Sequence, residues 1–347
     1  MQFLIIRRDN IGDLVCTTPL LTALRARYPN AWIGVLANAY NAPALQHNPD
    51  IDEIFAYQKR KHLPATDSVT QPRWVTRLPF VLLAQATLAR IAMLWRLRQR
   101  HIDTVILAAG SNDQHGRRFA RWIAPQHIVS ADAIAPGQHE VERVHSAARA
   151  LAVQGAIPAL TTVATAQATG AARAAFNHLT TSANTASPVI GIHISARRLK
   201  QRWPAQQWID LIHTLHLAHR ARLLLLWSPG ATDHPQHPGD DALAAHILSH
   251  SKTVSIVGLP TTDLGALIGA LDVCDLLVCS DGGAMHLAAG LHVPLVCLFG
   301  DSPVARWRPW ASPHQVLAAP SGVVSELEVA TVAQAVQAQL PKQFKPA

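Results

Sequence analysis

Short apolar runs alternate with longer segments of mixed polarity along most of the chain. The runs are four to seven residues long, which is typical of strands buried on both faces of a parallel sheet. We expect strands at residues 2–6, 32–37, 51–57, 103–109, 189–194, 222–228, 254–257, 276–279 and 294–299. Helix-compatible segments lie between them, at residues 13–28, 78–95, 165–179, 205–218 and 284–289. This alternation predicts an α/β protein built on parallel sheets.

Residues 271–300 contain the clearest strand–turn–helix–strand unit. Between its first strand and its helix lie Ser280, Asp281, Gly282 and Gly283. Adjacent glycines at the start of a helix let a ligand approach the backbone, and the free N–H groups of the first turn favour an anion such as phosphate. A glycine turn that only reverses the chain is the alternative.

The chain opens with a second unit of the same kind, in which an apolar run at 2–6 leads through a polar turn at 7–13 into a helix. Two such units far apart predict two doubly wound domains that face each other, which we place at residues 1–158 and 159–347. Asp13 stands at the start of the first helix, at the carboxyl end of the first strand. It is either an N-cap carboxylate or a general base placed where such a domain binds ligands.

A basic segment follows the strand at 189–194. It contains Ser195, Arg197, Lys200 and Arg202. Cations and a hydroxyl directly after a strand suit a phosphate clamp. A basic loop that faces solvent is the alternative.

Length, charge and cysteine content narrow the functional class. A chain of 347 residues, 49% of them hydrophobic and 15% charged, has the composition of a folded protein with two domains. The formal net charge of +8 favours acidic partners: nucleic acid, anionic lipid head groups or phosphorylated substrates. No basic motif interleaved with aromatic residues accompanies the charge, so nucleic acid is disfavoured as a partner.

The four cysteines form no C-x-x-C pair and are expected to be buried free thiols in a reducing cytosol. We find no signal-peptide layout before the first strand and expect a cytoplasmic protein.

The segment 78–95 is long and apolar and has arginines on its C-terminal side at Arg96, Arg98 and Arg100. Arg90 near its middle would cost about 2.5–3.5 kcal/mol in a membrane span, which argues against a transmembrane helix. Two interpretations stay open. The segment is a core-facing helix with a basic outer face, or a helix that rests on an anionic membrane surface.

Nineteen histidines raise the question of a metal site. His213 and His219, the outer two of three regularly spaced histidines, differ by about 240° around a helix, so the set cannot share one face. The sequence therefore predicts no metal centre.

At this point the residues resemble those of a known family, glycosyltransferase family 9, the ADP-heptose:lipopolysaccharide heptosyltransferases. Three segments in order carry the resemblance: Arg7-x-x-Asn10-Ile11-Gly12-Asp13-x-x-x-Thr17-x-Pro19, then Arg202-Trp203-Pro204, then Ser280-Asp281-Gly282-Gly283-Ala284-Met285-His286-Leu287-Ala288-Ala289. The resemblance covers nearly the whole chain. It implies a GT-B fold, in which two Rossmann-like domains face a central cleft, the first for the acceptor sugar and the second for the nucleotide-sugar donor.

The resemblance also implies an inverting transfer that needs neither metal nor cofactor, from ADP-heptose to the anionic lipopolysaccharide core. Asp13 matches the catalytic base, Asp281 a residue that contacts the donor sugar, and Ser195 a hydroxyl near the phosphates. The implied donor-binding set is Ser195, Arg197, Lys200, Arg202, Asp281, Gly282, Gly283 and His286, and the implied acceptor-binding set is Arg7, Asn10 and Gly12. An acceptor of this kind implies work at the cytoplasmic face of the inner membrane, with peripheral membrane contact.

Two positions depart from the family pattern. Gln201 stands where many members carry a lysine, with Lys200, Arg202 and Arg197 as potential substitutes, and Gly282 stands where Ser or Thr is frequent. These departures leave two alternatives to a heptosyltransferase. The chain is a related glycosyltransferase with another nucleotide-sugar donor, or a non-catalytic protein that binds nucleotide sugars.

Overall fold

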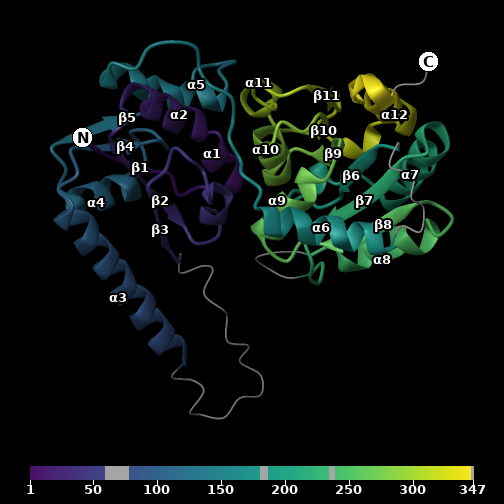
Figure 1. Cartoon of the computed structure of the whole chain (residues 1–347), viewed down its shortest axis with the longest axis horizontal. Helices are drawn as coiled ribbons and strands as arrows, with labels where there is room; N and C mark the ends of the chain where they lie inside the picture. The colour runs from purple at the N-terminus through teal and green to yellow at the C-terminus, as the bar shows by residue number, and fades with distance from the viewer. Residues whose placement is uncertain (59–77, 180–186, 234–238, 345–347) are drawn as a thin grey trace. The chain divides into compact units, whose positions relative to one another are not determined.

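The computed structural model describes residues 1–58, 78–179, 187–233 and 239–344 (Figure 1). The chain divides into two compact units, each built on its own sheet. Unit 1 comprises residues 1–135 and 141–158, and unit 2 comprises residues 136–140 and 159–347. Residues 136–140, which the sequence prediction placed in the first domain, thus cluster with unit 2. Within the described ranges, no helix combines the length and the hydropathy needed to cross a membrane.

The sheet of unit 1 has five parallel strands in the order β3-β2-β1-β4-β5. These are β1 (Gln2–Ile6), β2 (Trp32–Asn38), β3 (Glu53–Tyr57), β4 (Thr104–Leu107) and β5 (His127–Ser130). The helices are α1 (Ile11–Val15), α2 (Thr18–Arg27), α3 (Leu78–Gln99), α4 (Gln114–Ile123) and α5 (Glu140–His145), with short 3₁₀ helices at Ala42–Leu45 and Ser146–Leu151. The strand order reverses direction at β1, so the carboxyl ends of β1 and β4 form the place where an open α/β sheet binds ligands.

Strand β1 is buried on both faces because its alternate side chains enter two different cores. Phe3 and Ile5 pack with residues of α1 and α2, among them Leu14. Leu4 and Ile6 pack with residues of α3 and α4 on the other face. The strand is therefore apolar at every position after Gln2, as the sequence pattern predicted.

The sheet of unit 2 has six parallel strands in the order β11-β10-β9-β6-β7-β8. These are β6 (Val189–His193), β7 (Arg222–Trp227), β8 (Ile256–Pro260), β9 (Leu276–Ser280), β10 (Leu295–Phe299) and β11 (His314–Ala318). The helices are α6 (Ala166–Leu179), α7 (Ala205–His219), α8 (Asp241–His250), α9 (Leu264–Asp272), α10 (Gly283–Gly290), α11 (Val304–Trp307) and α12 (Val329–Gln339), with 3₁₀ turns at Leu199–Gln201, Val324–Glu326 and Lys342–Phe344. This is the doubly wound order of nucleotide-binding folds, and it reverses between β6 and β9.

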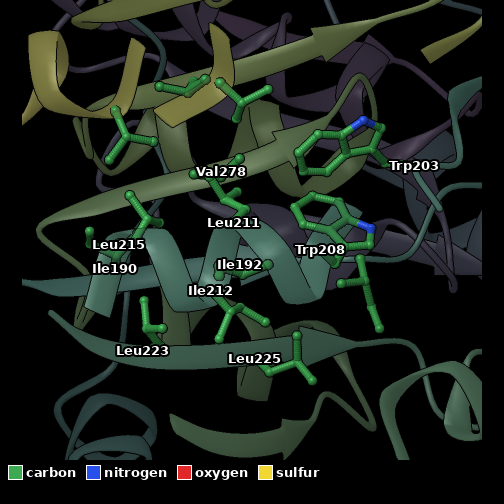
Figure 2. Close-up of a cluster of buried hydrophobic side chains, with 14 of the residues drawn as sticks. Ile190, Ile192, Trp203, Trp208, Leu211, Ile212, Leu215, Leu223, Leu225 and Val278 are labelled. Carbon is green, nitrogen blue, oxygen red and sulfur yellow. The ribbon is translucent and has the colours of Figure 1, made fainter. Parts of the chain in front are cut away.

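A pair of tryptophans anchors the loop that follows β6. The rings of Trp203 and Trp208 are perpendicular, with centroids 4.8 Å apart, and both are buried among the aliphatic side chains of β6, β7 and α7 (Figure 2). The Trp203 indole N–H donates to the carbonyl of Leu327 at 3.0 Å, and Pro204 forms the N-cap of α7. The Trp-Pro pair of the sequence motif therefore fixes the end of this loop in the core.

The helix expected at 13–28 is in fact two helices, α1 and α2, separated at residues 16–17. Pro19 explains the break, because within one continuous helix it would lack an N–H and clash with the carbonyl of Val15. The strand expected at 254–257 is also displaced, since β8 begins two residues later and runs to Pro260.

Candidate functional site

The candidate site of unit 1 is centred on Arg7, the first residue after β1. Its side chain is only 2% exposed, yet it carries a full charge. Nη1 donates to the carbonyl of Ala108, just after β4, at 2.7 Å, and Nη2 donates to Asp13 Oδ1. Arg7 thus joins the two strands at the point where the strand order reverses.

Asp13 uses both of its carboxylate oxygens. While Oδ1 accepts from Arg7, Oδ2 accepts from the backbone N–H of Asn10 at 3.1 Å and from its side-chain amide at 2.9 Å. Asp13 is therefore not the N-cap of α1; Asn10 is the N-cap, and Asp13 is the third helical residue reaching back to it. These donors fix the orientation of the carboxylate in a largely buried position.

A second carboxylate, which the sequence reasoning missed, shares the same arginine. Asp9 Oδ2 lies 3.1 Å from Arg7 Nε. Burial raises the pKa of Asp9, and the negative charge of Asp13 adds to that effect, while Arg7 opposes it. The site thus has two carboxylates in different environments on one guanidinium. The one sequence signal for Asp9 was its place in the polar turn beside Arg7.

Further charged groups line the same edge of the unit 1 sheet. Arg8, the next residue, donates to the Tyr57 hydroxyl at 2.8 Å and to Asp113 Oδ1 at 2.7 Å. Burial raises the pKa of Tyr57, so the phenol stays protonated at neutral pH. Arg143 donates to the Ala108 carbonyl at 2.9 Å, beside Arg7.

The structure places the three residues expected to bind the acceptor in different ways. Arg7 is covered and holds the two carboxylates, whereas Asn10 is exposed. Gly12 is buried in the first turn of α1. Of the three, only Asn10 presents its surface to solvent.

The candidate site of unit 2 is built around Gln201, where a lysine was expected. Its side chain is buried, and Nε2 donates to Asp281 Oδ2 at 3.0 Å and to Ser302 Oγ at 2.7 Å. Its carbonyl accepts from the Ser280 hydroxyl at 2.6 Å. Gln201 therefore ties together the segments that follow β6, β9 and β10, at the switch point of the sheet.

Arg202 is engaged in an ion pair inside the protein. Nη1 donates to Asp240 Oδ1 at 2.9 Å, and Nε donates to the carbonyl of Ala196 at 2.9 Å. Asp240 is 1% exposed, and Arg202 supplies the opposite charge that a buried carboxylate requires. Arg202 thus ties the loop after β6 to the start of α8.

The remaining polar residues of this loop lie nearer to solvent. Ser195 is half-buried, and its hydroxyl accepts from the backbone N–H of Ser228 at 2.9 Å. Arg197 and Lys200 are exposed, and the Lys200 ammonium lies 3.9 Å from Asp301. Among the basic residues expected to replace the lysine, these two are the ones exposed to solvent.

The mouth of α10 has the features expected of an anion site. Gly282 is its N-cap and brings no side chain to occupy the first-turn N–H groups. Its backbone is extended, and a Cβ added there would meet nothing nearer than Ser280 O at 4.0 Å. The rest of the helix, from Ala284 to Gly290, is buried, so its dipole acts through a medium of low dielectric constant. His286, however, is 2% exposed, packed edge-on against Trp307.

The structure therefore brings together part of the donor-binding set. Ser195, Arg202, Asp281, Gly282 and Gly283 occupy the carboxyl edge of the unit 2 sheet, Arg197 and Lys200 lie exposed on the same loop, and His286 lies inside the core. Within the described ranges, no three His, Cys, Asp or Glu side chains are grouped as metal ligands.

Comparison with known proteins identifies the family. A family model described as glycosyltransferase family 9 (heptosyltransferase) matches residues 97–335, well over half of the chain. The chain belongs to glycosyltransferase family 9. This family-9 enzyme is 25% identical over 311 residues to lipopolysaccharide heptosyltransferase 3 of Escherichia coli, covering 87% of this chain and 84% of that protein.

Solved structures confirm the GT-B fold of this family-9 glycosyltransferase. A family-9 glycosyltransferase from Veillonella parvula matches with a TM-score of 0.74 at 17% identity, over 97% of this chain and 96% of that one. Escherichia coli heptosyltransferase WaaC with ADP matches with a TM-score of 0.72 at 19% identity, over 98% of this chain and 100% of that one. Escherichia coli ADP-heptose lps heptosyltransferase II gives a TM-score of 0.72 at 19% identity, with 98% of both chains covered.

Proposed function

We propose that this family-9 enzyme transfers a heptose from ADP-heptose to the lipopolysaccharide core, by an inverting reaction that needs no metal, with Asp13 as general base. The substrate class is supported by the similarity to lipopolysaccharide heptosyltransferase 3, which extends over 87% of the chain. We place the reaction at the cytoplasmic face of the inner membrane, because the acceptor is a membrane lipid.

The arrangement around Asp13 supports its role as the base. In an inverting transfer the acceptor hydroxyl attacks the anomeric carbon while the diphosphate leaves from the opposite face, and the hydroxyl proton must pass to a base. Asp13 is held in a fixed orientation by Arg7 and Asn10, so it needs no rearrangement before it accepts the proton. This single observation carries the mechanistic proposal.

The edge of unit 2 offers what the leaving group requires. Negative charge grows on the diphosphate oxygens as the glycosidic bond breaks, and it must be stabilised without a metal. The uncapped mouth of α10 supplies N–H donors, and Arg197 and Lys200 supply exposed positive charge. Asp281, fixed by Gln201, then accepts hydrogen bonds from hydroxyls of the donor sugar.

A different nucleotide-sugar donor is the second candidate. It is favoured by Gln201, because an amide in place of a lysine removes one positive charge from the buried part of the donor site. Calorimetric titration with ADP, UDP and GDP, with and without EDTA, separates the two. Selective binding of ADP that EDTA leaves unchanged is expected, and preference for UDP or GDP would move the assignment to the second donor class.

Turnover with ADP-heptose and a core acceptor completes the test. The configuration of the product at the anomeric carbon, read by NMR, should be opposite to that of the donor. Retention of configuration would overturn the inverting mechanism. A protein that binds ADP but gives no product would be a non-catalytic nucleotide-sugar-binding relative.

A further inference from the structure

The described part of α3 carries an apolar stripe on the side that faces away from its own unit. Leu88, Ile91 and Trp95 are 65%, 57% and 62% exposed. At about 100° per residue they fall within an arc of about 60°. Leu97, about 180° from Leu88, is fully buried in the core of unit 1. The helix is therefore apolar on both its packed side and its outer side, whereas an ordinary surface helix is polar on the outside.

Helix α4 extends this surface. It packs beside α3, and Arg98 Nη1 donates to the carbonyl of Trp122 at 2.9 Å. The Trp122 side chain is 65% exposed. Figure 1 shows α3 extending away from the sheet of unit 1, with α4 next to the end of α3 that joins the sheet. Four of the large exposed apolar side chains thus lie on two neighbouring helices: Leu88, Ile91, Trp95 and Trp122.

The charge of the same surface has one sign. Neither α3 nor α4 contains an Asp or a Glu. Arg117, Arg118 and Arg121 are exposed, and within the part of the chain that the structure describes no carboxylate pairs with them. On the α4 helical wheel these arginines and Trp122 span about 140°, opposite the buried side of the helix.

We propose that the outward faces of α3 and α4, defined by Leu88, Ile91, Trp95, Trp122 and the three arginines of α4, form a docking surface for an anionic lipid bilayer. Tryptophan side chains partition to the boundary between head groups and acyl chains. The aliphatic side chains enter the acyl region, and the arginines contact anionic head groups. The outward faces of these two neighbouring helices together supply all three elements.

The chemistry of the α3–α4 surface favours a bilayer over other anionic partners. Leu88 and Ile91 would remain in water against a nucleic acid, which has no acyl region to receive them. The helix lies on the membrane and does not cross it, because no described helix is long and apolar enough to span a bilayer. The proposal rests on the proposed function in one respect: a surface of this kind holds the enzyme at a lipid acceptor.

The test is flotation of the full-length protein with two kinds of vesicle, one of phosphatidylcholine alone and one containing about 30% phosphatidylglycerol, an anionic composition of the kind that attracts basic surfaces. Binding to the anionic vesicles that weakens with salt is expected. Replacing Arg117, Arg118 and Arg121 by Gln should weaken partitioning of the protein to anionic vesicles roughly 100-fold. Each basic residue near an anionic surface contributes about 1 kcal/mol to the binding free energy. Leu88→Gln should also weaken it.

Leu217→Gln is the matched control for Leu88→Gln. Leu217 is 81% exposed on α7 in unit 2 and lies outside the α3–α4 surface. This variant should bind vesicles as the unaltered protein does. Circular dichroism establishes that each variant is folded, which is expected because the replaced side chains face solvent.

Three results would overturn the proposal: no binding to anionic vesicles, equal binding to neutral vesicles, or variants that partition as well as the unaltered protein. Self-association through this face in sedimentation experiments, unaffected by vesicles, would assign it to a second copy of the chain instead.

Turnover with a water-soluble acceptor fragment separates this proposal from the proposed function. The α3–α4 variants should keep that activity, and an enzyme inactive on every acceptor would overturn the function while the vesicle result still stands.

Discussion

Because Arg7 binds both Asp9 and Asp13, the structure leads to different predictions for these two carboxylates. Arg7 is 2% exposed and is bound by Asp13 through Nη2 and by Asp9 through Nε. If Asp13 is the base, Asp13→Asn should lower turnover by about 10²–10⁴ with donor binding retained, because the neutral amide cannot take the proton. Asp9→Asn should lower it far less.

The size of the Asp9 effect follows from the geometry. Carboxylates on Nε and Nη2 of one guanidinium lie roughly 5 Å apart, so their repulsion is about 1–3 kcal/mol at effective dielectric constants of about 20–80. The Asp9 side chain is 40% exposed, so solvent screening favours the lower end. Removing the charge of Asp9 therefore relieves Asp13 of a repulsion of about 1 kcal/mol. The fall in turnover on Asp9→Asn should therefore stay within about tenfold.

The effects of Asp9 and Asp13 on the free energy of unfolding should also be non-additive. The pKa of Asp9 is raised by burial, so its contribution to stability is complete below the unfolded value of about 3.9 and is lost as pH rises through the folded value. Asp9→Asn should then be neutral or stabilising at pH 7. In the double variant Asp9→Asn/Asp13→Asn, Arg7 loses both of these carboxylates, and the free energy of unfolding should fall by more than the sum of the two single losses.

The assay is a pH–rate profile from about pH 5 to 9, with urea unfolding of the two single variants and the double variant. Asp13→Glu serves as a control that keeps the charge but displaces the carboxylate. An Asp13→Asn enzyme within a few-fold of full activity, combined with a 100-fold loss in Asp9→Asn, would move the role of base to Asp9. Additive losses of stability would refute the reading of Arg7 as a buried charge shared by two partners.

Three further predictions concern unit 2. Gln201→Ala removes the amide that holds Asp281, so the KM for the donor sugar nucleotide should rise about tenfold, while calorimetric affinity for ADP, which lacks the sugar, should change little. Arg202→Met leaves Asp240 buried without a cation, so urea unfolding should report a loss of about 3–5 kcal/mol, and Asp240→Asn in the same chain should recover part of it. Burial raises the pKa of Cys274 to about 12, so its thiol should react with a disulfide reagent at pH 8 only as fast as the protein opens.

The parts of the fold that the sequence predicted are those whose burial is complete. Strands β1, β6, β9 and β10 lie inside their sheets and read as continuous apolar runs. Strands β5 and β11 escaped prediction because their side chains are only partly covered. The side chains of β5 are exposed or half-buried, and those of β11 are half-buried or exposed at every position, so neither leaves an apolar run to detect.

The site was predictable where its chemistry is local in sequence. Asp13 and Asp281 each stand beside a strand end and a helix start, and that placement is visible in the chain. The roles of Gln201 and Arg202 depend on partners far away: Ser302 lies 101 positions from Gln201, and Asp240 lies 38 positions from Arg202. No spacing rule connects such pairs. The loop was therefore expected to be a set of free cations, whereas its buried end is already neutralised.

Some arginines of the chain are buried in ion pairs and others are exposed to solvent, and this difference changes how the net charge of +8 is interpreted. Arg7 and Arg202 are buried and paired, so they shape their sites without adding field outside them. The exposed arginines of α4 have no such partners among the residues that the structure describes, and they project their charge into solvent. A basic isoelectric point in this enzyme therefore reports a surface for anionic partners more than a cationic active site. The two uses of arginine follow from burial alone: a buried guanidinium must find a carboxylate inside the fold, and an exposed one is left to find its anion outside.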